Sequence, residues 1–177
     1  PTLPEATCPD GTDVIDPGLC LLPPTVSADM TLTAGVDYLM EGRVTVGNGN
    51  GQLETNGDGT LSDGSSLRNV TLTIEAGVNV FGKSGTFANL VITRGSRLMA
   101  VGTKSAPIVF SSDDDGLAGS GEWGGLIMHG FAPHNECTED GEYCDIDSEG
   151  ESGFAGGYDP DDSSGVLKYV VVAEGGY

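Results

Sequence analysis

The sequence predicts an all-β protein built as a solenoid of short strands, and three observations support this. Short apolar runs such as VTLTI, IVF and YVVV recur along the chain, and many of its 29 glycines separate them. No stretch shows the i, i+3, i+4, i+7 spacing of apolar residues that an amphipathic helix requires. A strand–turn–strand unit also repeats, which is typical of coils whose turns stack on one another.

The repeat is visible in three segments that can be aligned: residues 31–42, 71–82 and 90–102. Each contains a short strand, a turn at a glycine, a second short strand and a further glycine. The turn glycines of the last two segments lie 18 residues apart, and those of the first two lie 42 apart, close to two units. One unit cannot bury its own apolar face, so we expect consecutive units to stack as rungs.

Residues 123–130 and 165–176 are expected to form further rungs, separated by long loops. The side chains that should point into one continuous core are Leu32, Leu72, Ile74, Val91, Leu98, Ile108, Phe110, Leu126, Val170 and Val172. An antiparallel β-sandwich is the alternative, because the Asn-Gly dipeptides at 48–49, 50–51 and 56–57 are typical of hairpin turns. The repeat favours the parallel β-helix.

With 177 residues the chain is long enough for one domain with a substantial core. We expect residues 1–24 to form a Pro-rich, Cys-paired arm and residues 25–177 to form the rungs. The last strand shows no cap, and solenoids normally cover such an edge. We therefore expect either further rungs of a longer solenoid or another chain at this open end.

The four cysteines fall into two close pairs, Cys8 with Cys20 and Cys137 with Cys144. Local pairs in an even number indicate two disulfides and an oxidising compartment. A zinc site is disfavoured, because neither pair has the CxxC spacing and the two histidines are not arranged as partners. No apolar run approaches the length of a membrane span, and the chain begins without the features of a signal peptide. We expect a mature exported protein, outside the cell or on its surface.

The charge is strongly negative, with 7 Lys+Arg against 27 Asp+Glu and a formal net charge of −20. Nucleic acids and anionic membranes are excluded as partners, because both would repel such a chain. The charge favours divalent cations as partners, or a high-salt medium that screens self-repulsion. The alternative is that acidity only keeps a surface protein soluble.

A calcium loop is predicted at SSDDDGLAGSGE, which begins at Ser111. Counted from there, Asp113, Asp115 and Glu122 occupy positions 3, 5 and 12, and a glycine occupies position 6. Alternate oxygens in such a tight turn converge on one cation. The flanking segments are strand-like, so an EF-hand is excluded and a strand-flanked calcium site is expected. A solvated acidic turn is the alternative.

A second candidate for metal binding is YDPDDSSG, in which Asp159 and Asp161 alternate before the next strand. Such a segment is also an ordinary turn. Between the two candidates lies an acidic excursion at residues 137–151, closed by the second cysteine pair, where we expect weak binding of divalent cations.

The sequence gives little indication of catalytic residues. Arg94, Arg97 and Lys104 are the bases nearest to the aspartate cluster, and we expect them to pair with surface charges. His129 and His134 are expected to be structural. The sequence contains no Ser/His/Asp order, nucleophile elbow or phosphate loop.

Four blocks carry a resemblance to a known family: LTIEAGVNVFG, LVITRGSRLMAVGTKSAPIVFSS, GEWGGLIMHGFAPHN and GGYDPDDSSGVLKYVVVAEGG. In this order, from about residue 31 to the end, they resemble an uncharacterised group of secreted bacterial proteins of the pectate-lyase-like superfamily. The resemblance implies a right-handed parallel β-helix and export from the cell. The group has no agreed activity, so no catalytic residue is implied.

Three functions are left open. The first is a non-enzymatic extracellular scaffold or binding protein that is acidic and binds calcium. The second is a polysaccharide-active lyase or hydrolase, or a fragment of one, which rests on analogy of fold alone. The third is a subunit that stacks head to tail into a fibre through its open end.

Overall fold

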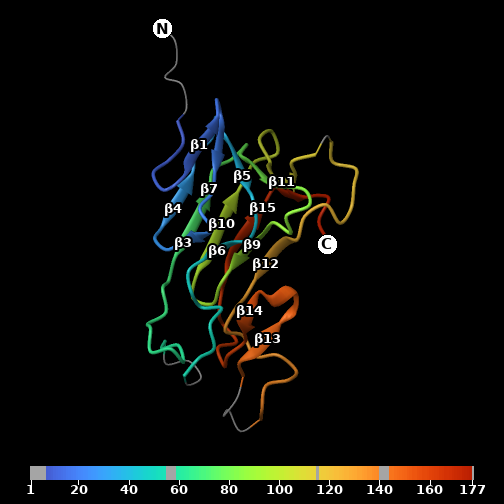
Figure 1. Ribbon diagram of the computed structural model, residues 1–177. Helices are drawn as coiled ribbons and strands as arrows, with labels where there is room; N and C mark the ends of the chain where they lie inside the picture. The colour runs from blue at the N-terminus through green and yellow to red at the C-terminus, as the bar shows by residue number, and fades with distance from the viewer. Residues whose placement is uncertain (1–6, 55–58, 115, 140–143, 177) are drawn as a thin grey trace.

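The computed structural model describes residues 7–54, 59–114, 116–139 and 144–176, which are almost entirely strands and turns (Figure 1). Three sheets, here called A, B and C, contain most of the strands. In spatial order, sheet A contains β1 (Asp13–Asp16), β2 (Leu19–Leu21), β5 (Asp37–Met40), β8 (Asn79–Gly82), β11 (Ile108–Ser112) and β16 (Val170–Val172). Sheet B contains β12 (Gly125–Met128), β9 (Asn89–Ile92), β6 (Val44–Val46) and β3 (Thr25–Val26). Sheet C contains β15 (Gly165–Lys168), β10 (Arg97–Val101), β7 (Thr71–Ile74) and β4 (Met30–Leu32).

From β3 onward the chain visits the three sheets in the fixed cycle B, C, A, so each cycle forms one rung. Within these sheets the neighbouring strands pair in parallel, apart from the hairpin β1–β2. An antiparallel bridge between Leu53 and Leu61 spans the third Asn-Gly dipeptide, but it is confined to a loop. The stacked parallel rungs therefore agree with the predicted repeat and not with the sandwich.

The phase of the predicted repeat is wrong. Tyr38 pairs directly with Val80 in the next rung, so the 42-residue interval is one rung with an insertion and not two units. Gly35 and Gly77 turn the chain from sheet C to sheet A, whereas Gly95 turns it from sheet B to sheet C. All three glycines have positive φ, between 78° and 94°. Different corners of the coil use the same backbone turn, which is why they look alike in sequence.

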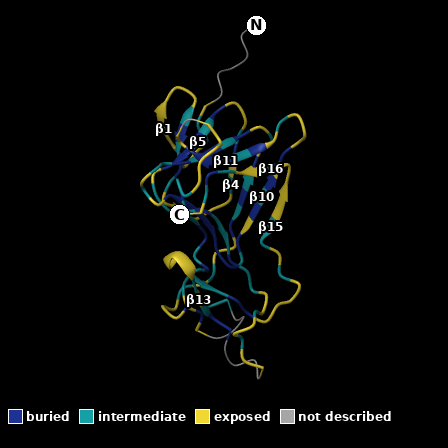
Figure 2. Cartoon of the chain, turned by 90° about the vertical axis from the view of Figure 1, so that its right-hand side faces the viewer, coloured by how far each residue is buried: buried dark blue, intermediate teal, exposed yellow. Residues whose placement is uncertain are grey.

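The core fills the space between the three sheets, and most of the predicted core residues lie there (Figure 2). Those that are buried in the core are Leu32, Leu72, Ile74, Leu98, Ile108 and Phe110. Leu126 and Val170 are partly buried against it. Val172, on the last strand, is 50% exposed, so its predicted burial is wrong.

Val91 is buried but faces the other side of sheet B. Alternate residues of a strand point to opposite faces, and its neighbours Leu90 and Ile92 belong to the core. Its position on the outer face shows that this face is also covered by protein.

The arm at the N-terminus is joined to the coil through β2, which pairs in parallel with β5. The disulfide between Cys8 and Cys20 ties the start of the described chain to this strand, and Cys20 lies in the core. The Cys-paired arm therefore contributes a strand to sheet A.

Two long insertions, residues 47–70 and 129–164, leave the coil between strands. The second carries the small antiparallel hairpin of β13 (Ile146–Ser148) and β14 (Gly153–Ala155), linked by the short 3-10 helix η1 (Glu149–Glu151). This hairpin lies on the side of the molecule opposite the N-terminus, below the strands of sheet B (Figure 1). No helix in the described part of the chain is long and apolar enough to cross a membrane.

Candidate functional site

A buried ion pair holds the second insertion against the coil. Arg94 follows β9 and has 0% of its surface exposed, and its Nη1 lies 2.7 Å from Asp145 Oδ1. The same guanidinium donates to three backbone carbonyl oxygens, those of Gly49, Gly51 and Gly156. The glycines belong to both insertions, so one side chain joins both of them to the rung that contains β9.

Asp145 offsets the cost of burying the positive charge of Arg94. Burial lowers the pKa of the Arg94 guanidinium, while the hydrogen bond and charge of Asp145 act in the opposite direction. The second oxygen of Asp145 accepts the backbone N–H of Leu53 at 3.0 Å, and the ring of Phe131 lies 5.7 Å from the guanidinium carbon. The predicted role of Arg94 in surface charge pairing is therefore wrong, because the side chain is fully buried.

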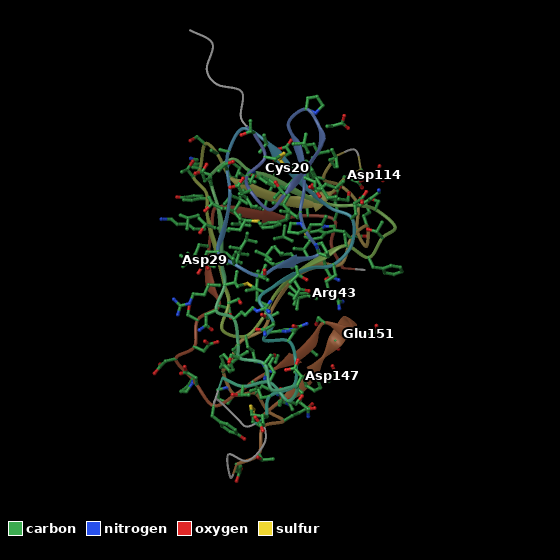
Figure 3. All side chains as sticks on the ribbon, turned by 60° about the vertical axis from the view of Figure 1, so that its left-hand side comes forward. Cys20, Asp29, Arg43, Asp114, Asp147 and Glu151 are labelled. Carbon is green, nitrogen blue, oxygen red and sulfur yellow. A yellow bond between two sulfur atoms is a disulfide. The ribbon has the colours of Figure 1, made fainter. Side chains whose placement is uncertain are left out.

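A second arginine positions the hairpin from the other side. Arg43, between β5 and β6, donates from Nη1 to the carbonyl oxygen of Glu151 and from Nη2 to that of Gly150. Its Nε donates to Asn89 Oδ1 at 2.9 Å. Arg43, on the coil, lies next to Glu151, in the turn of the hairpin (Figure 3).

Between sheet B and this hairpin lies a cleft of about 760 Å³. Sheet B contributes the apolar side chains of Ile127 and Met128, and Phe87 lies just before β9. The other lining residues are Arg43, Asn89, Gly124, His129, Ser148, Glu149, Gly150, Glu151 and Ala155. Its size and its mixture of an apolar floor with a few polar groups are those of a ligand site.

His129 provides the most unusual polar group of the cleft. The residue is 3% exposed, and its Nε2 lies 3.0 Å from Ser148 Oγ and 3.2 Å from Ser152 Oγ. Ser152 has a closer acceptor in the carbonyl oxygen of Glu149 at 2.9 Å, and Ser148 donates to the carbonyl oxygen of Gly153. Because both hydroxyl protons are used in this way, we assign the imidazole proton to Nε2 as a donor to these hydroxyls.

The other ring nitrogen of His129 is then an acceptor without a donor. Nδ1 is buried and has no hydrogen-bond partner among the described residues. Burial lowers the pKa of His129, and the positive charges of Arg94 and Arg43 lower it further. The ring is therefore neutral at pH 7, and a buried unpaired acceptor of this kind requires a donor from water or a ligand.

Phe87 forms an exposed aromatic surface at the cleft. The residue is 59% exposed, and its backbone has a φ of +56°, a left-handed conformation that aromatic residues rarely adopt. Strain of this kind is concentrated at functional positions.

The predicted calcium loop has carboxylates that are already hydrogen-bonded. Asp113 Oδ1 accepts the backbone N–H of Ser84 at 2.7 Å, and Glu122 Oε2 accepts the hydroxyl of Ser112 at 2.6 Å. Asp115 lies outside the described residues. The described carboxylates of this loop do not form a group of three that could surround one ion.

Glu174, which the sequence did not indicate, shares the hydroxyl of Ser112 with Glu122. Burial opposes the charge of Glu174, but hydrogen bonds from Ser112 and from the backbone N–H groups of Gly119 and Ala118 outweigh it and lower its pKa. The loop is thus tied to the last rung through this carboxylate.

The second acidic candidate forms a local turn. Asp159 Oδ1 accepts the backbone N–H of Asp161 at 3.0 Å, and both side chains are exposed. Within the acidic excursion, Asp140 and Glu142 lie outside the described residues, while Asp145 is the buried partner of Arg94. Both predicted disulfides are confirmed, since Cys137 is bonded to Cys144 as Cys8 is to Cys20.

The stacked rungs and the cleft on the outer face of sheet B define an all-β protein with one candidate ligand site among its described residues. A model of the pectate-lyase-like β-helix domain matches residues 56–177, and the chain belongs to this family. No curated protein and no solved structure matches the chain.

Proposed function

We propose that this chain is a non-enzymatic extracellular binding domain that holds a neutral polysaccharide in the cleft between sheet B and the β13–β14 hairpin. The observation that carries the proposal is the presence in one cleft of the exposed Phe87 and of His129, a lining residue whose buried Nδ1 has no hydrogen-bond partner among the described residues.

The chemistry of the cleft favours a sugar. A sugar hydroxyl can donate to His129 Nδ1, and the C–H face of a sugar ring can pack on an exposed aromatic ring such as Phe87. The formal net charge of −20 disfavours an anionic polysaccharide, which the domain as a whole would repel. A neutral glycan fits both requirements.

The arrangement of Ser148 favours binding over catalysis. A nucleophilic serine gives its proton to a histidine, but here Ser148 donates to the carbonyl oxygen of Gly153 and His129 acts as a donor. Glu149 and Glu151 are the only carboxylate residues among the described lining of the cleft. A lyase or hydrolase is the alternative, and release of reducing ends from a bound polysaccharide would support it.

The architecture that we propose is a right-handed parallel β-helix. Parallel strands joined by a crossover in one sheet are right-handed in about 98% of cases, and the cyclic order of sheets B, C and A requires such crossovers throughout. The extracellular location rests on the two disulfides, which form and persist in oxidising compartments.

The replacement of Phe87 by alanine tests the glycan proposal. We expect it to weaken binding of a neutral oligosaccharide about two- to twelvefold, because a stacking contact of about 0.5–1.5 kcal/mol is lost. Isothermal titration of cello-, xylo- and manno-oligosaccharides against the wild type and the variant measures this.

Tyr169→Ala is the matched control, since Tyr169 is 52% exposed but lies outside the cleft, and it should bind as the wild type does. Equal affinities of wild type and Phe87→Ala for every neutral glycan that binds would exclude the cleft as the site.

Binding should also weaken as the pH falls below the lowered pKa of His129, because Nδ1 then carries a proton and no longer accepts a hydrogen bond.

Calcium binding at residues 113–122 is a second proposal, and it rests on the sequence spacing alone. Saturating calcium should raise the melting temperature, by a linkage of about 2.7 kcal/mol at one hundred times the dissociation constant. Replacing Asp113 and Asp115 together by asparagine should remove most of this gain and leave the fold intact, because an asparagine at 113 can still accept the N–H of Ser84.

The control for this experiment is the double variant Asp10→Asn/Asp13→Asn, which changes the same charge at two exposed positions outside both acidic candidates. Thermal melts of all three proteins are compared at matched ionic strength. If calcium shifts all three melts equally, the loop at residues 113–122 is only a solvated acidic turn.

A further inference from the structure

We propose that the Cys137–Cys144 disulfide is a thiol–disulfide exchange site, in which His134 stabilises the thiolate that forms when a dithiol reduces the bond. The proposal is independent of the glycan cleft. It rests on the surroundings of the two sulfur atoms, which differ from those of the other disulfide.

The imidazole of His134 lies beside both sulfur atoms. One ring nitrogen and the two Sγ atoms all lie within 4.8 Å of one another. In addition, the backbone N–H of His134 points to Cys137 Sγ at 3.1 Å. The disulfide therefore contacts one backbone N–H donor and lies close to one imidazole ring.

The protonation of this imidazole follows from its hydrogen bonds. Its Nδ1 accepts the backbone N–H of Glu136 at 3.2 Å, which places the proton of the neutral ring on Nε2. Nε2 is buried and has no hydrogen-bond partner among the described residues. A disulfide sulfur is a weak acceptor, whereas a thiolate is a strong one, so reduction would give this buried N–H the partner that it lacks.

Among the described residues, the charges near the sulfurs do not cancel this effect. Asp145 directly follows Cys144, but its carboxylate is paired with Arg94 at 2.7 Å. Glu136 and Glu139 are exposed, so solvent screens their charges.

In the described part of the chain, the Cys8–Cys20 disulfide has no comparable surroundings. The chain has two histidines, and the other one, His129, is bonded to the serines of the cleft. Cys20 lies in the apolar core, and Cys8 packs against it. An apolar environment disfavours a thiolate, so this disulfide should resist reduction.

The exchange reaction is balanced by the reducing dithiol. A thiolate of the dithiol attacks Cys137 Sγ, which is half-buried, and the fully buried Cys144 leaves as the thiolate. The second thiol of the reductant then attacks the mixed disulfide and releases Cys137. Two electrons pass to the protein, which holds two thiols, and the reductant becomes a disulfide.

Reduction should not unfold the domain. Asp145, next to Cys144, remains bound to Arg94 and to the backbone of Leu53, so the chain after the loop stays anchored.

The test is equilibration of the intact protein with mixtures of reduced and oxidised dithiothreitol, followed by alkylation and peptide mass analysis of both disulfides. We expect Cys137–Cys144 to be reduced in more oxidising mixtures than Cys8–Cys20. His134→Ala should lower the equilibrium constant for reduction of Cys137–Cys144 about tenfold, equivalent to about 30 mV. The constant for Cys8–Cys20 in the same sample should not change.

His134→Gln provides the conservative variant, because its amide can still donate to a thiolate, and it should recover part of the lost tenfold. Circular dichroism of each variant shows whether it is folded, and Cys8–Cys20 serves as the internal reference. The proposal is overturned if both disulfides are reduced in the same mixtures, or if His134→Ala and His134→Gln leave the constant for Cys137–Cys144 within twofold of the wild type.

Discussion

Replacing Arg94 by alanine is expected to lower the free energy of unfolding by about 3–5 kcal/mol, the cost typical of breaking a buried ion pair. The substitution leaves the carboxylate of Asp145, which is 3% exposed, without its charged partner. It also removes the donor for three backbone carbonyl oxygens in the two insertions. Each buried group left without a partner adds its own desolvation penalty.

Two related variants separate the charge from the geometry. Arg94→Lys keeps the charge but cannot supply the planar set of donors, so we expect it to remain clearly destabilised. Asp145→Asn leaves the Arg94 charge buried and unpaired and should also be strongly destabilised. Arg97→Ala is the matched control, because Arg97 is an exposed arginine three residues away and its loss should cost less than about 0.5 kcal/mol.

Urea denaturation followed by circular dichroism measures these differences. If Arg94→Ala and Arg97→Ala have the same midpoint, the buried pair does not anchor the insertions. A change in the slope of the transition would show separate unfolding of the hairpin, because the slope follows the surface exposed.

The sequence predicted those parts of the fold that depend on local pattern. Short apolar runs and turn glycines such as Gly77 identify strands and corners, because strand alternation and positive φ are properties of neighbouring residues. The two disulfides were predictable for the same reason, since each joins cysteines that are close in the sequence. The phase of the rungs was not, because the insertion at residues 47–70 has no counterpart in the next rung.

The candidate site depends on contacts between distant residues, and the sequence did not reveal it. His129 and Ser148 are 19 residues apart, and Arg43 meets Glu151 across 108 residues. The one usable signal was the presence of arginines in so acidic a chain: the scarcity of basic residues makes each one a candidate for a specific role. Arg94 was noticed instead as one of the bases nearest to the aspartate cluster, and it was placed on the surface because burial cannot be read from its neighbours.

The acidic segments show a similar limit. Carboxylates at alternating positions predict a cation site, yet Asp113 and Asp159 each accept a backbone N–H in the structure. Aspartate favours turns because its side chain can bond to the nearby backbone, and this use gives the same sequence pattern as metal binding. Spacing alone therefore does not distinguish the two.

Replacing Trp123 by alanine should also destabilise the domain by about 3–5 kcal/mol, the cost of removing a large buried aromatic side chain. Trp123 is 0% exposed in the core, and its Nε1 donates to the carbonyl oxygen of Ala173 in the last rung at 2.8 Å. Its indole packs directly on Gly82, where a Cβ atom would lie 2.9 Å from Cε3. The side chain therefore fills the space between successive rungs.

Graded variants distinguish packing from hydrogen bonding at this position. Trp123→Phe keeps most of the apolar volume and should cost less than Trp123→Ala, although it loses a hydrogen bond worth about 1 kcal/mol. Gly82→Ala should cost about 1–3 kcal/mol by overpacking against the same ring.

Trp123 is the single tryptophan of the chain, so its variants are followed by far-ultraviolet circular dichroism and not by fluorescence. At about 2–4 °C per kcal/mol, Trp123→Ala should melt at least 6 °C below the wild type. A melt within 2 °C of wild type would mean that the rungs pack independently of this side chain.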